Sequence, residues 1–146
     1  MAEFFAREAR FLDKSQATSA VRASARESNG KVYVVKATID LAAQTNASGD
    51  THVLGQLPVD RSFLFGQIVT TVSLGTSTVS IGTRATPALF RAAGTFTTTN
   101  VPTNFGAAAA VGATPVEGGD DLLLTVATAG LPATGTVVVT LYFVGP

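Results

Sequence analysis

The sequence predicts an all-β domain, built as a sandwich or a barrel of about seven short strands. Apolar and polar residues alternate with a period of two through most of residues 31–146, as expected for strands with one buried face. Clusters of Gly, Asn, Asp and Pro separate these runs at the spacing typical of such folds. Strands do not alternate with helical segments, so a parallel α/β fold is not expected.

The strongest strand signal lies at the start of this region, in Lys31–Leu41. One parity of this run is predicted to be buried: Tyr33, Val35, Ala37, Ile39 and Leu41. The other parity, which includes Val34, is predicted to face solvent mostly. A turn at Gln44–Asp50 leads to a strand at Thr51–Leu57, and Pro58 ends that strand because proline has no ladder donor.

Two strands are predicted in the middle of the chain, at Phe63–Leu74 and Ser77–Thr83. Only Gly75 and Thr76 separate them, and such a short link predicts a hairpin. Gly66 interrupts the parity of the first strand and indicates a bulge there.

Further strands are predicted at Ala88–Thr99, Leu122–Thr128 and Thr136–Val144. Asn100–Glu117 is predicted to be a long loop with at most one helical turn, because Gly and Pro bracket Ala107–Ala110 closely. The last strand is apolar on both parities, so we expect it to be central in a sheet or covered on both faces.

Composition limits the possible functions. Of 146 residues, 14% are charged and 46% hydrophobic, with zero formal net charge and no cysteine. The chain lacks the basic excess that would indicate nucleic-acid binding. It also lacks the run of about 18 apolar residues that would indicate a membrane span. Weakly charged chains near neutrality tend to associate. We therefore expect much of the surface to be buried in an assembly, although exposed faces of small neutral side chains are the alternative.

The first thirty residues differ from the rest, because they carry many of the charges and a weak helical pattern of apolar residues. We predict an N-terminal arm over residues 1–30, with a short helix at Ala2–Leu12 followed by extended chain; the alternative is a frayed terminus. Docking of the arm on a neighbouring subunit would use Phe4, Phe5, Arg7, Arg10, Phe11 and Leu12.

Residues capable of catalysis or metal binding are few. His52 is the only histidine, and its neighbours Ser48 and Asp50 lie on the same turn, where a catalytic triad rarely forms. Five aspartates could supply oxygen ligands to calcium, but no D-x-D-x-D-G spacing is present: Asp40, Asp50, Asp60, Asp120 and Asp121. No nucleotide-binding glycine motif occurs. We therefore predict no catalytic residue, cofactor or metal, and no enzymatic activity.

The aromatic side chains of residues 31–146 suit packing better than sugar binding, because sugar-binding surfaces usually use Trp and Tyr. Six phenylalanines are predicted to lie in the core or in an interface: Phe63, Phe65, Phe90, Phe96, Phe105 and Phe143. The scattered arginines Arg61, Arg84 and Arg91 suit salt bridges to a partner or plain solvation equally well.

Three segments in this order resemble small virion proteins of tailed bacteriophages. They are SGDTHVLGQLPVDRSFLFGQIVTTVSLG (Ser48–Gly75), STVSIGT (Ser77–Thr83) and GGDDLLLTVATAGLPATGTVVVTLYFV (Gly118–Val144). The resemblance extends over roughly Lys31 to Val144. Its motifs are moderately specific and none is catalytic.

The resemblance implies a single antiparallel β-sandwich, jelly-roll-like, of about seven to eight strands over residues 31–146, preceded by the arm. It implies a virion protein assembled in the host cytoplasm, most similar to capsid decoration (cement) proteins. These bind the major capsid protein, commonly as homotrimers on the capsid surface, and clamp capsomers with terminal arms. The alternative is a tail, neck or fibre component that contacts a host-surface glycan. Neither role implies nucleic-acid or membrane binding.

Overall fold

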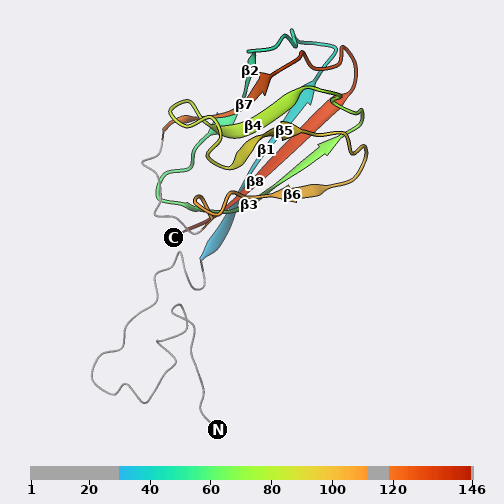
Figure 1. Cartoon of the computed structure of the whole chain (residues 1–146). Coiled ribbons are helices and arrows are strands. Elements are labelled where there is room, and N and C mark those ends of the chain that lie inside the picture. The colour runs from blue at the N-terminus through green and yellow to red at the C-terminus, as the bar shows by residue number, and fades with distance from the viewer. Residues whose placement is uncertain (1–29, 112–118, 146) are drawn as a thin grey trace, which may run out of the picture.

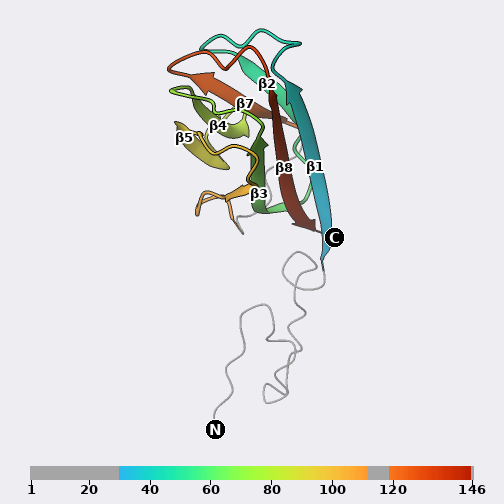
Figure 2. The same cartoon turned by 90° about the vertical axis from the view of Figure 1, so that its right-hand side faces the viewer.

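The computed structural model describes residues 30–111 and 119–145, and this part of the chain contains eight strands and no helix. In chain order they are β1 (Lys31–Asp40), β2 (Thr51–Gln56), β3 (Ser62–Thr70), β4 (Thr78–Thr83), β5 (Arg91–Thr95), β6 (Thr103–Phe105), β7 (Asp121–Ala127) and β8 (Thr136–Gly145). They form two four-stranded sheets that face each other (Figures 1 and 2). The predicted all-β sandwich is therefore confirmed.

The strand order identifies the architecture. Sheet A has the order β1-β8-β3-β6 and sheet B the order β2-β7-β4-β5, and all neighbours are antiparallel. Four strand pairs are nested along the chain: β1–β8, β2–β7, β3–β6 and β4–β5. The chain therefore forms one long hairpin that closes at β4–β5. This hairpin is rolled up, so that successive pairs alternate between the two sheets. This is the topology of an eight-stranded jelly roll.

Strand β8 lies inside sheet A, between β1 and β3, as its apolar sequence predicts. Its odd-numbered residues from Val137 to Phe143 are almost fully buried, and the even-numbered ones are half-buried. The parity predicted for β1 is also correct, since Ile39 is buried and Val34 exposed. Gly145 pairs with Lys31, so the end of β8 lies beside the start of β1 (Figure 1).

The core between the sheets contains a cluster of three phenylalanine rings. The centroid of Phe63 lies 4.5 Å from that of Phe90 and 5.7 Å from that of Phe143, and the last two rings meet edge to face at 6.0 Å. All three side chains are at most 3% exposed. Phe96 is also buried and Phe105 packs against the core, as predicted, whereas Phe65 is on the surface.

The predicted hairpin of Phe63–Leu74 and Ser77–Thr83 is wrong, because β3 lies in sheet A and β4 in sheet B. A tight turn does form, with the Ser77 amide donating to the Leu74 carbonyl at 3.2 Å. However, β3 ends at Thr70, and the chain then crosses to the other sheet, where the Leu74 amide bonds the Phe96 carbonyl. The short link at Gly75 and Thr76 therefore joins a strand of one sheet to a strand of the other, and not two strands that pair with each other.

The predicted bulge at Gly66 is displaced. The register with β8 shifts between Phe63 and Phe65, and Gly66 itself is regularly paired. Glycine is needed there for another reason, since a Cβ would lie 2.2 Å from the Phe105 ring. That ring belongs to β6, a three-residue strand inside the segment predicted to be a loop.

The strand predicted at Ala88–Thr99 is shorter, because β5 covers only Arg91–Thr95. Phe90 and Phe96 flank β5 and are buried, whereas Ala92, which has the same parity, is exposed. After β6, the amides of Ala110 and Val111 both donate to the Ala107 carbonyl, which forms the single turn predicted in this segment.

Candidate interaction surface

All residues of the predicted arm that were assigned to partner binding lie outside the described residues: Phe4, Phe5, Arg7, Arg10, Phe11 and Leu12. The described chain begins at Gly30, directly before β1. The surface around the start of β1 is therefore the part of the domain nearest to the predicted arm.

Five apolar side chains gather on the outer face of sheet A, where β1 begins and β8 ends. We call them the sheet A patch: Val32, Val34, Phe65, Tyr142 and Val144. Val32 is 58% exposed, Val34 54% and Phe65 38%, while Tyr142 and Val144 are half-buried. Contiguous exposed apolar surface of this kind marks interaction sites in soluble proteins.

The strand register brings the patch together. Val32 lies opposite Val144, and Tyr142 lies between Val34 on β1 and Phe65 on β3. The rings of Phe65 and Tyr142 stack, with centroids 4.5 Å apart and planes inclined by 16°. Cross-strand pairs of this type stabilise a sheet by about 0.2–1 kcal/mol each. Their outward surfaces still face water, so a partner could bury them further.

Polar side chains border the patch on two sides. Farther along β1, Lys36 lies opposite Thr140 of β8. Toward β6, the Gln67 Nε2 atom donates to Asn104 Oδ1 at 3.2 Å. An apolar centre with a polar rim is the usual anatomy of a protein–protein interface.

The patch also borders the longest edge strand among the described strands. Free edges are commonly blunted by shortness or by bulges. Of the four edge strands, β6 has three residues, and the register of β2 shifts between Val53 and Gly55. By contrast, β1 has ten residues that pair with β8 without a shift. Figure 2 shows β1 at the outer edge of sheet A.

Arg91 covers the remaining edge, at β5, and the sequence gives no signal for this role. Its guanidinium donates to four carbonyls, namely those of Val79, Ala92, Gly94 and Thr95. Burial lowers the pKa of this guanidinium from its usual range. Within the described residues, this partly buried guanidinium bonds backbone carbonyls, and the predicted salt bridge to a partner stays a prediction.

Near the start of β1, Arg61 stacks on Tyr33, with its guanidinium carbon 3.8 Å from the ring centroid. Gly145 leaves room for this arginine, since a Cβ there would lie 2.3 Å from Arg61 Cδ. A cation over an aromatic face contributes about 0.5–1 kcal/mol at exposed sites. This contact joins the turn before β3 to β1 beside the sheet A patch.

His52 lies on β2 and is 6% exposed. Its Nδ1 hydrogen-bonds the Gln44 side chain, at 2.7 Å from Oε1. The described residues offer Nε2 no hydrogen-bond partner. Asp50, the third member of the triad considered from sequence, instead accepts from the Ala47 amide at 2.8 Å. The histidine is therefore placed as a buried structural group.

Stability should depend on the protonation of His52. Desolvation lowers the pKa of this imidazole below its ordinary value, and the nearby Asp50 charge opposes this only in part. Below about pH 6.5 the unfolded chain gains a proton that the folded one resists, so the free energy of unfolding should fall. The slope should stay under about 1.4 kcal/mol per pH unit, the limit for one proton.

Urea unfolding at a series of pH values between 8 and about 5 measures this slope. In a His52→Gln variant, which keeps a hydrogen-bonding side chain without the titration, the stability should be flat over the same range. An equal slope in both proteins would assign the effect to other groups.

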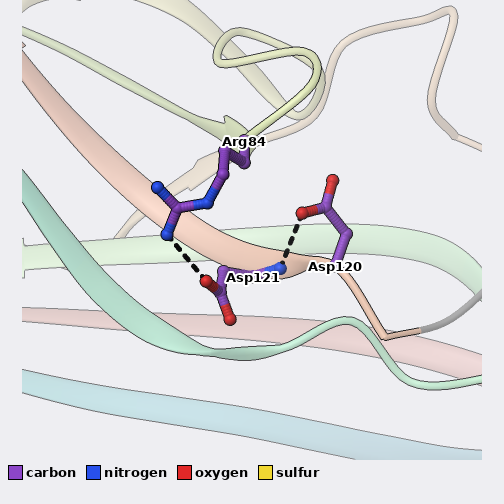
Figure 3. A network of polar contacts seen from close by, with 3 residues as sticks. All are labelled: Arg84, Asp120 and Asp121. Carbon is purple, nitrogen blue, oxygen red and sulfur yellow. Dashed lines mark hydrogen bonds and ion pairs between the residues drawn. The ribbon is translucent and has the colours of Figure 1, made fainter.

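The adjacent acids Asp120 and Asp121, at the start of β7, have local roles. Asp121 Oδ2 accepts from Arg84 Nη2 at 2.8 Å, and Asp120 Oδ1 accepts from the Asp121 amide (Figure 3). The hydrogen bond to Asp121 raises the pKa of the exposed Arg84. An exposed ion pair stabilises by about 0–1 kcal/mol. The network therefore ties β7 to the end of β4 without forming a reactive site.

No three His, Asp or Glu side chains come together as a possible metal site within residues 30–111 and 119–145. The Asp40 carboxylate also has a local role, since it accepts from the Ala42 amide at 3.0 Å. In the same part of the chain, no helix has the length and apolar character needed to span a membrane.

No protein-family model matches the sequence, and no curated protein is similar to it. In structure, the chain is similar to a chain in the capsid asymmetric unit of cyanophage Pam1, with a TM-score of 0.64 and 20% identity over 80% of this chain and 86% of that one. A chain in the capsid of Ralstonia phage GP4 has a TM-score of 0.64 and 21% identity, over 80% and 85%.

A chain in the acid-stable capsid of Helicobacter pylori bacteriophage KHP30 has a TM-score of 0.55 and 16% identity, over 79% of this chain and 88% of that one. These identities are low, so the similarity concerns the fold. The chain therefore has the jelly-roll fold found in chains of three bacteriophage capsids.

Proposed function

We propose that this protein is a non-catalytic structural component of a bacteriophage virion, and more specifically a capsid decoration (cement) protein. In this role it binds the major capsid protein on the outside of the shell, as a homo-oligomer and preferably a trimer. It is assembled in the host cytoplasm.

The observation that carries the proposal is the similarity of fold. It extends over about four-fifths of this chain and 85–88% of each capsid chain, so it involves most of each chain and not one shared segment. The segments Ser48–Gly75, Ser77–Thr83 and Gly118–Val144 independently resemble small virion proteins of tailed phages. The two arguments are distinct, because one uses the backbone and the other uses local sequence.

The sheet A patch supports a role in assembly. An outer face with Val32 and Val34 more than half exposed suits a molecule that is covered by neighbours. A decoration protein stabilises a shell by adding interface across the boundaries of its subunits, and a standard interface buries about 800 Å² per partner. Such a role depends on exposed apolar surface, which the described domain has in the sheet A patch.

Deleting Met1–Glu27 should weaken attachment to phage shells while the sandwich stays folded. The deletion removes four apolar residues and two arginines assigned to the arm, and it leaves β1 intact. We expect a loss of at least tenfold in affinity, which corresponds to about 1.4 kcal/mol. Co-sedimentation of purified protein with undecorated shells measures the affinity, and thermal unfolding of the free protein checks the fold.

Undiminished binding by the truncated protein would remove the arm from the attachment. Imaging of particles that contain this chain distinguishes the shell from the tail, neck or fibre. Density on the tail, together with micromolar binding on a glycan array, would favour the alternative function and contradict the decoration role.

A further inference from the structure

We infer that the sheet A patch is a receptor for the apolar part of the N-terminal segment, residues 4–12, donated by a second copy of this chain. This inference rests on the proposed function, since it names the neighbouring subunit on which the arm docks. It assigns to the arm a partner among the copies of the decoration protein itself, in addition to any contact with the shell.

The chemistry of the two surfaces is complementary. The segment offers three phenylalanines and a leucine within nine residues, Phe4, Phe5, Phe11 and Leu12. The patch offers exposed valines beside the stacked rings of Phe65 and Tyr142. Burying one large apolar side chain is worth about 1.5–3 kcal/mol. Several such side chains would therefore hold the segment even after the cost of ordering it.

The position of the patch fits a segment that arrives from outside sheet A. The patch begins at Val32, two residues after Gly30, and it crosses from β1 over β8 to β3. Neighbouring strands are about 4.8 Å apart, so this distance is only about 10 Å. An apolar segment of nine residues is long enough to cover it.

The length of the intervening chain favours a second copy over the same one. Residues 13–30 number eighteen (30 − 13 + 1). A fold back onto the chain's own patch would need a turn of only about 2–5 residues. A coil of eighteen residues would have a mean reach of about 23 Å. A domain of this size has a radius of gyration of about 13 Å, so a connection of this length is long enough for the patch of an adjacent copy.

The other large surfaces of the sandwich are less available. On sheet B, the segment after β4 packs over β4, since Gly82 approaches the Thr86 carbonyl so closely that a Cβ would lie 2.2 Å from it, and Val53 on β2 is a large apolar side chain of this sheet that is 61% exposed. The edge at β5 is occupied by Arg91. Within the described residues, sheet A beside the chain entry therefore combines several neighbouring exposed apolar side chains with a long, regularly paired edge strand.

Disulfide trapping tests the exchange directly, because the chain contains no cysteine. Two full-length single variants, Phe5→Cys and Val34→Cys, are mixed in equal amounts and oxidised gently. Since neither chain holds both thiols, a 5–34 disulfide found by peptide mass spectrometry can form only between copies. The yield of this disulfide should be at least five times the yield of a 5–93 disulfide in a matched mixture of Phe5→Cys and Ala93→Cys. Ala93 is an exposed position on β5. An equal yield in the two mixtures would overturn the inference.

A second measurement uses the oligomer itself. Val34→Lys places a charge in the patch, whereas Thr38→Lys places the same charge farther along β1, also at an exposed outward position. We expect Val34→Lys to weaken self-association at least tenfold in analytical ultracentrifugation and Thr38→Lys to change it little. Equal behaviour of the two variants would contradict the inference. So would a 5–34 disulfide that forms in a double variant, with Phe5→Cys and Val34→Cys in one chain, but not in the mixture of the two single variants. Shell binding that persists without exchange would overturn this inference alone, leaving the decoration role standing.

Discussion

Replacing Phe143 with alanine is expected to lower the free energy of unfolding by about 3–5 kcal/mol. The side chain is 1% exposed and lies on the central strand of sheet A. Its ring contacts those of Phe63 and Phe90, which come from different parts of the chain. Alanine would remove these contacts and leave a cavity that the neighbouring strands β1 and β3 cannot close, because each is fixed to β8 by its own ladder.

Urea or guanidinium unfolding at neutral pH measures this loss. Thr140→Ala is the matched control, since Thr140 lies on the same strand but faces outward and is half-buried. Its cost should be below about 1 kcal/mol, the usual range of strand propensities. For a domain whose total stability is about 5–15 kcal/mol, the Phe143 change should remove about a fifth or more of it. Similar costs for the two variants would mean that the three rings do not form the centre of the core.

Replacing Gly82 with alanine is expected to cost about 3 kcal/mol or more, the upper part of the range for overpacking. A Cβ at this position would lie 2.2 Å from the Thr86 carbonyl oxygen and 2.5 Å from the Pro87 carbonyl carbon. Both are backbone atoms and cannot rotate away. The turn is also fixed, because the Thr83 and Leu89 amides both donate to the Thr86 carbonyl. A methyl group would therefore push the whole turn off sheet B.

Gly94→Ala provides the matched control in the neighbouring strand. Its added Cβ would meet nothing nearer than 3.8 Å, from an Arg91 side-chain atom. We expect a change within about 1 kcal/mol, in either direction, because alanine also restricts the unfolded chain. Thermal unfolding of both variants compares them. A Gly82→Ala protein as stable as Gly94→Ala would show that the turn does not pack on β4.

Patterns within single strands were predictable from the sequence, and contacts between strands were not. The alternation in β1 and the apolar character of β8 correctly indicate which residues face the core. The link at Gly75 was misleading because a tight turn can join two sheets as readily as two paired strands. Strand β6 has three residues, too few for any period to appear.

The same distinction applies to the interaction surface. The outward direction of Val34 follows from parity, and Phe65 was among the residues predicted for the core or an interface. Their assembly into one patch with Tyr142 depends on the register of β8 with both of its neighbours. That register joins residues about 110 and 77 positions apart (142 − 34 = 108; 142 − 65 = 77), so no local pattern could give it. The arm residues remain a prediction.

The nesting of the four strand pairs has a consequence for how the molecule is made. In sheet A, β1 has only β8 as a partner, and β8 is the last of the described strands to be synthesised. The strand β1 therefore stays without its partner until about a hundred further residues have been added. Folding dominated by such distant pairings is slow, with a relaxation of milliseconds to seconds. Nascent chains stalled before Thr136 should be substrates for chaperones and prone to aggregation, and completion of the last ten-residue strand should release them.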